Sequence, residues 1–132
     1  MKFKNIDGRT ISINLAKLST CTRESASKGH QTTAEALTQV FDGFAIYQEV
    51  YIDRIYLDFF IPLLKIVIEV DGIQHDKYTE FFHKDGSGFL KSIKRDEQKE
   101  DFCKKNGLKF IRIVTSQYKK IEDIIAFIKN NL

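Results

Sequence analysis

Two carboxylates, Asp58 and Glu69, lie inside runs of β-branched and aromatic residues, a setting in which acidic side chains are uncommon. The two runs, residues 55–61 and 66–70, are separated by a four-residue connection that begins with Pro62. A proline at this place favours a type I turn, so the pattern predicts a β-hairpin. The hairpin would bring the two acids onto neighbouring strands. Its other face is wholly apolar and is expected to face the core; it carries Leu57, Phe59, Ile61, Ile66, Ile68 and Val70.

The register of this hairpin decides how close the acids come. Pairing Ile61 with Ile66 places Asp58 directly opposite Glu69, and the two-residue period of a strand puts Asp71 on the same face. Opposed residues have Cβ atoms roughly 5 Å apart, where like charges destabilise a sheet. Oxygen ligands this close are what Mg²⁺ prefers, so we expect a metal site. The alternative is a solvated sheet face that ends in ordinary turn residues.

An acid on one strand, a short turn, and then Glu-x-Asp-Gly followed by His resembles the core of PD-(D/E)XK restriction-endonuclease-like nucleases. The pattern is particularly similar to the very-short-patch-repair endonuclease branch and its small uncharacterised relatives, and it runs from about Thr32 to Val114. The resemblance implies an α/β fold whose mixed central sheet is flanked by helices in the order α-β-β-β-α-β. It also implies Mg²⁺-dependent hydrolysis of DNA phosphodiester bonds.

The resemblance assigns roles to the acids. Asp58 and Glu69 would hold Mg²⁺ together with the Val70 carbonyl, Asp71 would hold a second ion, and Mn²⁺ is expected to substitute. Glu35 matches an acid that relatives sometimes contribute from a preceding helix. Its alternative role is that of a capping residue, which bonds back to the first amide of that helix.

The resembled family places a lysine two residues after the second acid, but Asp71 occupies that position here. A lysine must therefore come from elsewhere if the family's chemistry is kept. Lys99 is the best candidate, because it follows Asp96 by three residues on a helical stripe that continues to Cys103. In the family a flap, expected here at residues 76–88, is followed by a basic residue, Asp and then Lys. Arg95 supplies the basic residue. The alternative is an exposed Asp-Lys surface pair.

Gln74 and His75 leave the strand just beyond the acids. His75 is placed to orient a water molecule or to protonate the leaving oxygen. Its alternative role is a hydrogen bond within the loop. We therefore count both residues among the candidate catalytic residues.

The second half of the chain carries an excess of basic residues. Residues 76–132 contain 13 Lys and Arg against 9 Asp and Glu, whereas residues 1–75 contain 8 against 9. Such a distribution suits a partner that is a polyanion, and we expect double-stranded or structured DNA. The expected DNA contacts are phosphate binding by Lys91, Lys94 and Arg95 and base stacking by Phe81 and Phe82. The alternative for the two phenylalanines is to pin their loop to the core.

The remaining elements follow from periodicity and turn residues. The length of 132 residues suits one domain, in which residues 1–31 form an extension and residues 32–132 the nuclease-like core. The expected elements are an N-terminal β-hairpin (2–6 and 10–14), a helix with a capping box from Thr32, a strand (44–50), a helix (90–106), a strand (108–114) and a final helix capped by Thr115 or Ser116.

The composition also limits location and function. The two cysteines have no spacing typical of zinc sites or disulfide scaffolds. No apolar run is long enough for a membrane span, and no export signal follows Met1. A cytoplasmic protein is therefore expected. The main alternative function is a nuclease-like fold that binds nucleic acid or a protein without cutting. A phosphatase of small molecules is a third reading, which the lack of a glycine-rich phosphate cradle disfavours.

Overall fold

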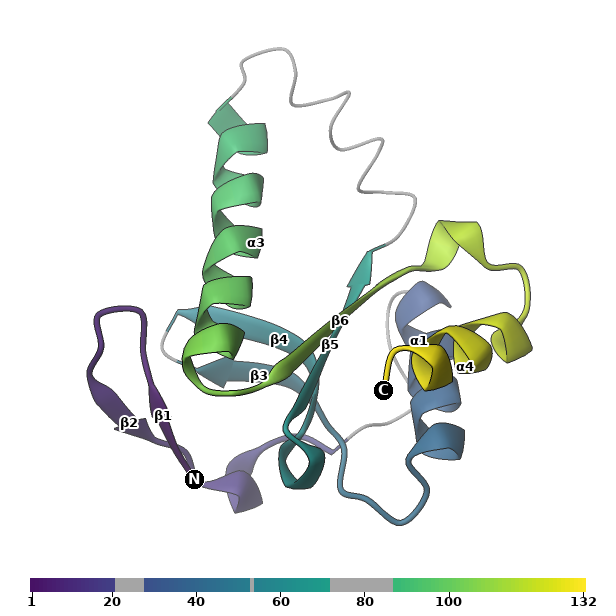
Figure 1. Ribbon diagram of the computed structural model, residues 1–132, viewed down its shortest axis with the longest axis horizontal. Helices are drawn as coiled ribbons and strands as arrows, with labels where there is room; N and C mark the ends of the chain where they lie inside the picture. Colours follow the sequence, from purple (N-terminus) through teal and green to yellow (C-terminus); the bar gives the residue numbers. More distant parts are fainter. Residues whose placement is uncertain (21–27, 53, 72–86) are drawn as a thin grey trace.

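The computed structural model describes residues 1–20, 28–52, 54–71 and 87–132, and for residues 87–94 it describes the backbone alone. These residues form an α/β fold with a four-stranded mixed sheet, three helices and a separate N-terminal two-stranded hairpin. The predicted fold class is therefore confirmed. Figure 1 shows the sheet between α3 (Ser87–Lys105) on one side and α1 (Lys28–Val40) with α4 (Ile121–Asn130) on the other.

The sheet has the strand order β3 (Tyr47–Ile52), β4 (Ile55–Ile61), β5 (Ile66–Asp71) and β6 (Lys109–Val114). The first three strands are antiparallel, and β5 pairs with β6 in parallel. A parallel pair needs a crossover, and α3 provides it. The segment of the chain that carries the two acids is thus the centre of the sheet.

The predicted register of the β4–β5 hairpin is confirmed where the strands pair. Ile61 faces Ile66 and Phe59 faces Ile68. The connection is a 3₁₀ turn over Pro62–Leu64 that ends at Lys65 in the left-handed region, with φ 56°. Proline at the first position of this turn sets its backbone angle.

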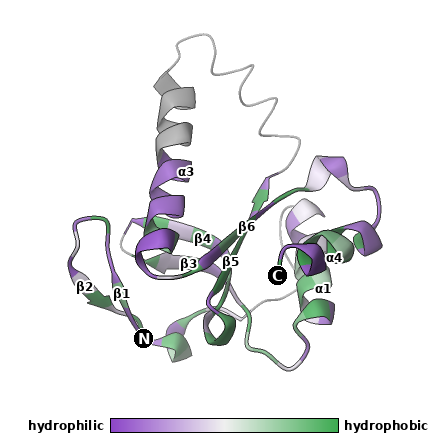
Figure 2. Ribbon diagram, viewed as in Figure 1, coloured by the Kyte–Doolittle hydropathy of each residue, from purple (hydrophilic) through white to green (hydrophobic). Residues whose placement is uncertain are grey.

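One face of the hairpin builds the first hydrophobic cluster, as expected. Phe59, Ile61, Ile66 and Ile68 pack with α1 and α4. Figure 2 shows the apolar residues concentrated in the strands and in these two helices, whereas the described turns of α3 are mainly hydrophilic. The members contributed by the helices and by β6 are Ala34, Ala36, Leu37, Ile111, Ile113, Ile124 and Ile128.

A second hydrophobic cluster lies on the side of α3, and the sequence did not predict it. Phe60 and Val67 point to this side and pack with Phe102 and Cys103 of α3. Leu57 also belongs to this cluster, which corrects its expected place beside Phe59. Regular pairing of β3 with β4 is interrupted at Glu49 and Asp58, and Glu49 has a left-handed φ of 52°, so the strict alternation of faces fails there.

The N-terminal hairpin, β1 (Lys2–Lys4) and β2 (Thr10–Ser12), contributes to this second cluster. Its turn contains Gly8 at φ 83°, as the Asp-Gly pair predicts. Phe3 is buried, and its ring centroid lies 5.7 Å from that of Phe60 and 5.8 Å from that of Phe102. The hairpin is therefore part of the core.

Asn106, at the end of α3, holds the hairpin by its backbone. Its Oδ1 accepts a hydrogen bond from Lys4 N at 2.7 Å, and its Nδ2 donates to Lys4 O at 2.9 Å. The amide side chain thereby replaces a neighbouring strand along the edge of β1. The preceding residue, Lys105, donates a hydrogen bond from Nζ to Ile6 O at 3.1 Å.

Several predicted boundaries are wrong. Helix α1 begins at Lys28, so Thr32 is an interior residue whose hydroxyl bonds to Lys28 O, and no capping box starts there. The first core strand begins at Tyr47. The last helix begins after Lys120, because a 3₁₀ turn over residues 115–117 intervenes.

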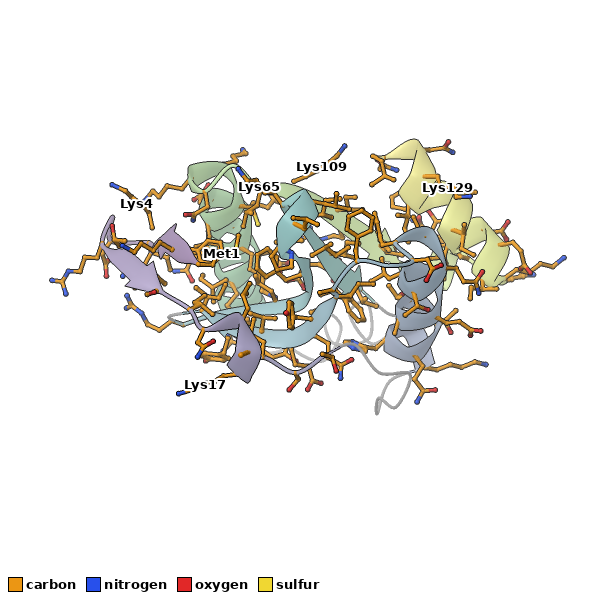
Figure 3. The ribbon with its side chains drawn as sticks, turned by 90° about the horizontal axis from the view of Figure 1, so that it is seen from below. Met1, Lys4, Lys17, Lys65, Lys109 and Lys129 are labelled. Atoms are coloured by element: carbon orange, nitrogen blue, oxygen red, sulfur yellow. The ribbon has the colours of Figure 1, made fainter. Side chains whose placement is uncertain are left out.

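The outer surface is largely polar. Figure 3 shows the labelled lysines at the periphery, around a densely packed interior. Within the described ranges, no helix combines the length and the apolar character needed to cross a membrane.

Candidate acid site between β4, β5 and α3

Asp58 and Glu69 lie where strands β4 and β5 stop pairing. The last backbone pair of the ladder is Phe59 with Ile68. One position further, Asp58 Oδ2 accepts a hydrogen bond from the backbone N–H of Val70 at 2.9 Å. The Asp58 carboxylate thus takes the place of a backbone acceptor, and it is held beside Glu69. The two acids that the sequence singled out are brought together.

Burial makes this carboxyl pair unusual. Glu69 is only 5% exposed. Burial, a hydrogen bond with Asp58 and the Asp58 charge together raise the pKa of Glu69 to about 9, although Lys99 opposes the shift. Near neutral pH the Glu69 carboxyl therefore keeps a proton, and it is hydrogen-bonded to Asp58. A cation that binds this pair would replace that proton.

Lys99 reaches this pair from α3. Its Nζ lies 3.3 Å from Glu69 Oε1 and 5.9 Å from the ring centroid of Tyr56. One turn further along the helix, Phe102 and Cys103 are buried in the second hydrophobic cluster and anchor α3 against the sheet. The expected contact between Lys99 and the acids is therefore present.

Asp71 does not join the other two acids. Its Oδ2 lies 3.1 Å from Arg112 Nε, and Arg112 Nη2 lies 3.7 Å from Asp96 and 3.8 Å from Glu100. This corrects the expectation of three adjacent carboxylates, and Asp96 faces Arg112 of β6. Among the residues that the structure describes, no three His, Cys, Asp or Glu side chains form a group that could hold a metal ion.

Glu35 is also separate from the acid pair. It belongs to α1, which packs on the opposite face of the sheet from α3. It is absent from the charged groups that shift the pKa of Glu69. The structure therefore does not bring Glu35 to the predicted metal site.

Two further residues border the site and were missed from the sequence. Tyr56 lies under Lys99, and its pKa is raised to about 12 by burial and by the charges of Glu49, Asp58 and Glu69. A hydrogen bond with Glu49 adds to the shift. The sequence could have revealed Glu49, because a tight turn that pairs residue 52 with residue 55 sets a register that aligns Glu49 with Asp58.

The other predicted site residues are only partly described. Arg95 is exposed on α3, and Lys91 and Lys94 precede it on the same helix with their backbones alone described. The remaining predicted residues, Gln74, His75, Phe81 and Phe82, lie outside the described residues.

Comparisons with known proteins give distant relatives. No family model matches the chain, and no solved structure matches it. Over 76 residues the chain is 32% identical to uncharacterized protein 307L of Invertebrate iridescent virus 6, and the matched region covers 58% of this chain and 36% of that protein. It is 29% identical over 76 residues to uncharacterized protein 033L of Invertebrate iridescent virus 3, covering 58% and 38%. The matches thus span less than two fifths of the length of these curated relatives.

Proposed function

We propose that this protein is a metal-dependent endonuclease that hydrolyses phosphodiester bonds of DNA. The observation that carries the proposal is the carboxyl pair of half-buried Asp58 and buried Glu69, with Lys99 Nζ 3.3 Å from Glu69. Two acids and a lysine in contact, at the point where two strands separate, are the groups that metal-assisted phosphodiester hydrolysis uses. A fold without such a role would gain stability from apolar side chains at these positions.

The donor set fits one cation rather than two. Mg²⁺ usually takes one or two protein carboxylates and completes its octahedron with water and phosphate oxygens. Asp58 and Glu69 would provide those two carboxylates, and the Val70 carbonyl is a third candidate oxygen. Asp71 is held by Arg112, so a second ion at Asp71 is not supported. When bound, the ion would polarise the phosphate and lower the pKa of a bound water.

Lys99 would supply the fixed positive charge that the Glu-x-Asp motif lacks. It comes from a helix anchored by buried residues, so its Cα is held in place over the sheet. Its ammonium group can balance the charge that develops on the phosphate in the transition state. Tyr56 lies beneath it and keeps a neutral phenol under physiological conditions, because the pKa is about 12.

Helix α3 also supports DNA binding. Lys91, Arg95 and Lys99 are spaced by four residues and therefore lie along one side of a helix. With a rise of about 1.5 Å per residue, Lys91 is about 12 Å from Lys99 along the axis. This is a line of basic positions that leads toward the acid pair. The free, buried thiol of Cys103 is compatible with a reducing compartment, and we place the activity in the cytoplasm.

The decisive experiment combines cleavage with isosteric variants. Supercoiled plasmid and labelled mismatch or junction duplexes are incubated with the protein in Mg²⁺, Mn²⁺ or chelator. We expect cleavage only with metal, and its loss in Asp58→Asn and in Glu69→Gln. Glu122→Gln, at an exposed position of α4, is the matched control and should cut normally.

The outcomes separate the two candidate functions. Cleavage that is unchanged in both acid variants would place the active site elsewhere. DNA binding without cleavage in any metal would favour the alternative, a nuclease-like fold that binds without cutting.

A further inference from the structure

Two tyrosines form an exposed aromatic pair on the β3–β4 hairpin. Tyr51 and Tyr56 are direct partners in the register of these strands. Their ring centroids lie 6.1 Å apart at an interplanar angle of 67°. Tyr51 is 68% exposed and Tyr56 is 37% exposed, so a large part of both rings is open to solvent.

This pair adjoins the acid site. The ring centroid of Tyr56 is 5.9 Å from Lys99 Nζ, and Lys99 is in turn 3.3 Å from Glu69. Tyr56 and Asp58 belong to the same strand, two residues apart. A molecule that lies against the tyrosines would therefore have its neighbouring groups at the two acids.

One cation contacts the tyrosine pair, and another belongs to the same hairpin. Lys99 lies beside Tyr56, and Arg54 belongs to the tight connection between the two strands, where its φ is 68°. Arg54 Nη2 contacts Asp7 Oδ2 at 2.9 Å, but both side chains are well exposed. Exposed ion pairs contribute little free energy, so a phosphate can replace Asp7 at this guanidinium.

Exposed aromatic rings next to positively charged side chains are the chemistry by which proteins bind single-stranded nucleic acid. We propose that Tyr51 and Tyr56 form a stacking surface for an unpaired base of DNA next to the Asp58–Glu69 pair. This inference rests on the proposed function and narrows its substrate class to DNA that has unpaired nucleotides at the cleavage point. Bases within a duplex stack on one another, so their faces are not open to such a surface.

A cross-strand aromatic pair can also serve only to stabilise its hairpin. The two roles predict different measurements. If the pair is purely structural, removing it changes the free energy of unfolding but not the ratio of the affinities for single-stranded and duplex DNA. If the pair is a stacking surface, removing it changes that ratio.

The test measures DNA binding in chelator, where no cleavage occurs. Fluorescence anisotropy gives the Kd for a labelled oligothymidine and for a duplex of equal length. We expect Tyr51→Ala to weaken single-strand binding about tenfold, the loss of one stacked base, while duplex binding changes less than about twofold. Tyr51→Phe keeps the ring and should bind the single strand within about twofold of the parent protein.

Phe44→Ala is the matched control, because Phe44 is 38% exposed and lies outside the β3–β4 hairpin. It should leave both affinities unchanged, and thermal unfolding of each variant shows that the fold is kept. An unchanged single-strand Kd in Tyr51→Ala, or an equal loss for duplex, would overturn the stacking surface. Metal-dependent plasmid cleavage tests the proposed endonuclease function separately, so either proposal can fail while the other holds.

Discussion

Lys99 Nζ and Glu69 Oε1 lie 3.3 Å apart, a contact between a helix and the central strand beneath it. In the proposed nuclease, Lys99 would supply from another element the positive charge that the Glu-x-Asp motif lacks. The contact forms because the helix that crosses from β5 to β6 lies over the end of the β4–β5 ladder.

Lys99→Ala should lower the rate of metal-dependent cleavage by about 10² to 10³, the usual loss when a charge that stabilises a transition state is removed. DNA affinity should fall by far less than the cleavage rate, and thermal stability should change little. Single-turnover cleavage and anisotropy measure the two effects. Lys104→Ala, at an exposed position of the same helix, is the control. Lys105 is unsuitable as a control because its Nζ donates a hydrogen bond to Ile6 O. Small and equal effects at positions 99 and 104 would remove Lys99 from the mechanism.

The stability of the protein should fall as the pH rises. The pKa of Glu69 is about 9 in the folded protein and near 4.5 in the unfolded chain, so the folded state binds more protons between these values. This contribution is complete below about pH 4.5 and is lost as the pH approaches about 9, at no more than about 1.4 kcal/mol per pH unit. Urea unfolding of the parent protein and of Glu69→Gln measures it. Identical pH slopes for the two proteins would contradict the shifted pKa.

Millimolar Mg²⁺ or Mn²⁺ should raise the melting temperature, because an ion that binds only the folded state stabilises it. The shift should be larger at pH 8 than at pH 6, since the ion competes with the proton on Glu69. Differential scanning calorimetry gives both values. Asp58→Asn should abolish the shift, whereas Glu122→Gln should retain it. A parent protein that shows no shift in either metal would argue strongly against the metal site.

Replacing Lys91, Lys94 and Arg95 together by Gln should weaken DNA binding on every sequence. If all three contact phosphate, the slope of log K against log salt should decrease in magnitude by about 2.7. Titrations at several salt concentrations measure this slope. The control replaces three exposed lysines of other elements, Lys17, Lys109 and Lys129, by Gln. A similar decrease in both triple variants would show only the effect of net charge.

Phe3→Ala should cost about 3 to 5 kcal/mol of unfolding free energy, the usual loss for a buried phenylalanine. Phe3 contacts both Phe60 and Phe102, so the truncation leaves a cavity under α3. Denaturant unfolding measures the loss. Met1→Ala, at an exposed neighbouring position, should cost less than about 0.5 kcal/mol. A cost below about 1 kcal/mol at Phe3 would show that the hairpin is not part of the cooperative core.

The β4–β5 hairpin and its register could be predicted, because two apolar runs around Pro62 permit one pairing that buries a whole face. The contact of Lys99 followed from helical spacing, since Cys103 and Phe102 had to point inward. Local patterns were sufficient for both.

Other features depend on partners that are distant in sequence. Asp71 follows the same two-residue period as Glu69, but Arg112 of β6 lies close enough to bind it, and no local pattern reveals that pair. The N-terminal start of α1 was missed because Gly29 is a poor helix former, a preference that tertiary packing overrides here. Phe3 is buried only because a helix about one hundred residues later covers it.

The amide of Asn106 that completes the edge of β1 also sets an order of events. Lys4 and Asn106 are 102 residues apart, so at ribosomal rates Lys4 is synthesised roughly 5 to 20 s before its partner exists. During that interval β1 has an unpaired edge and Phe3 has no cover. Contacts between such distant residues also slow the folding of the finished chain, because a long loop must close before they form. The native contacts of β1 with α3 therefore form late.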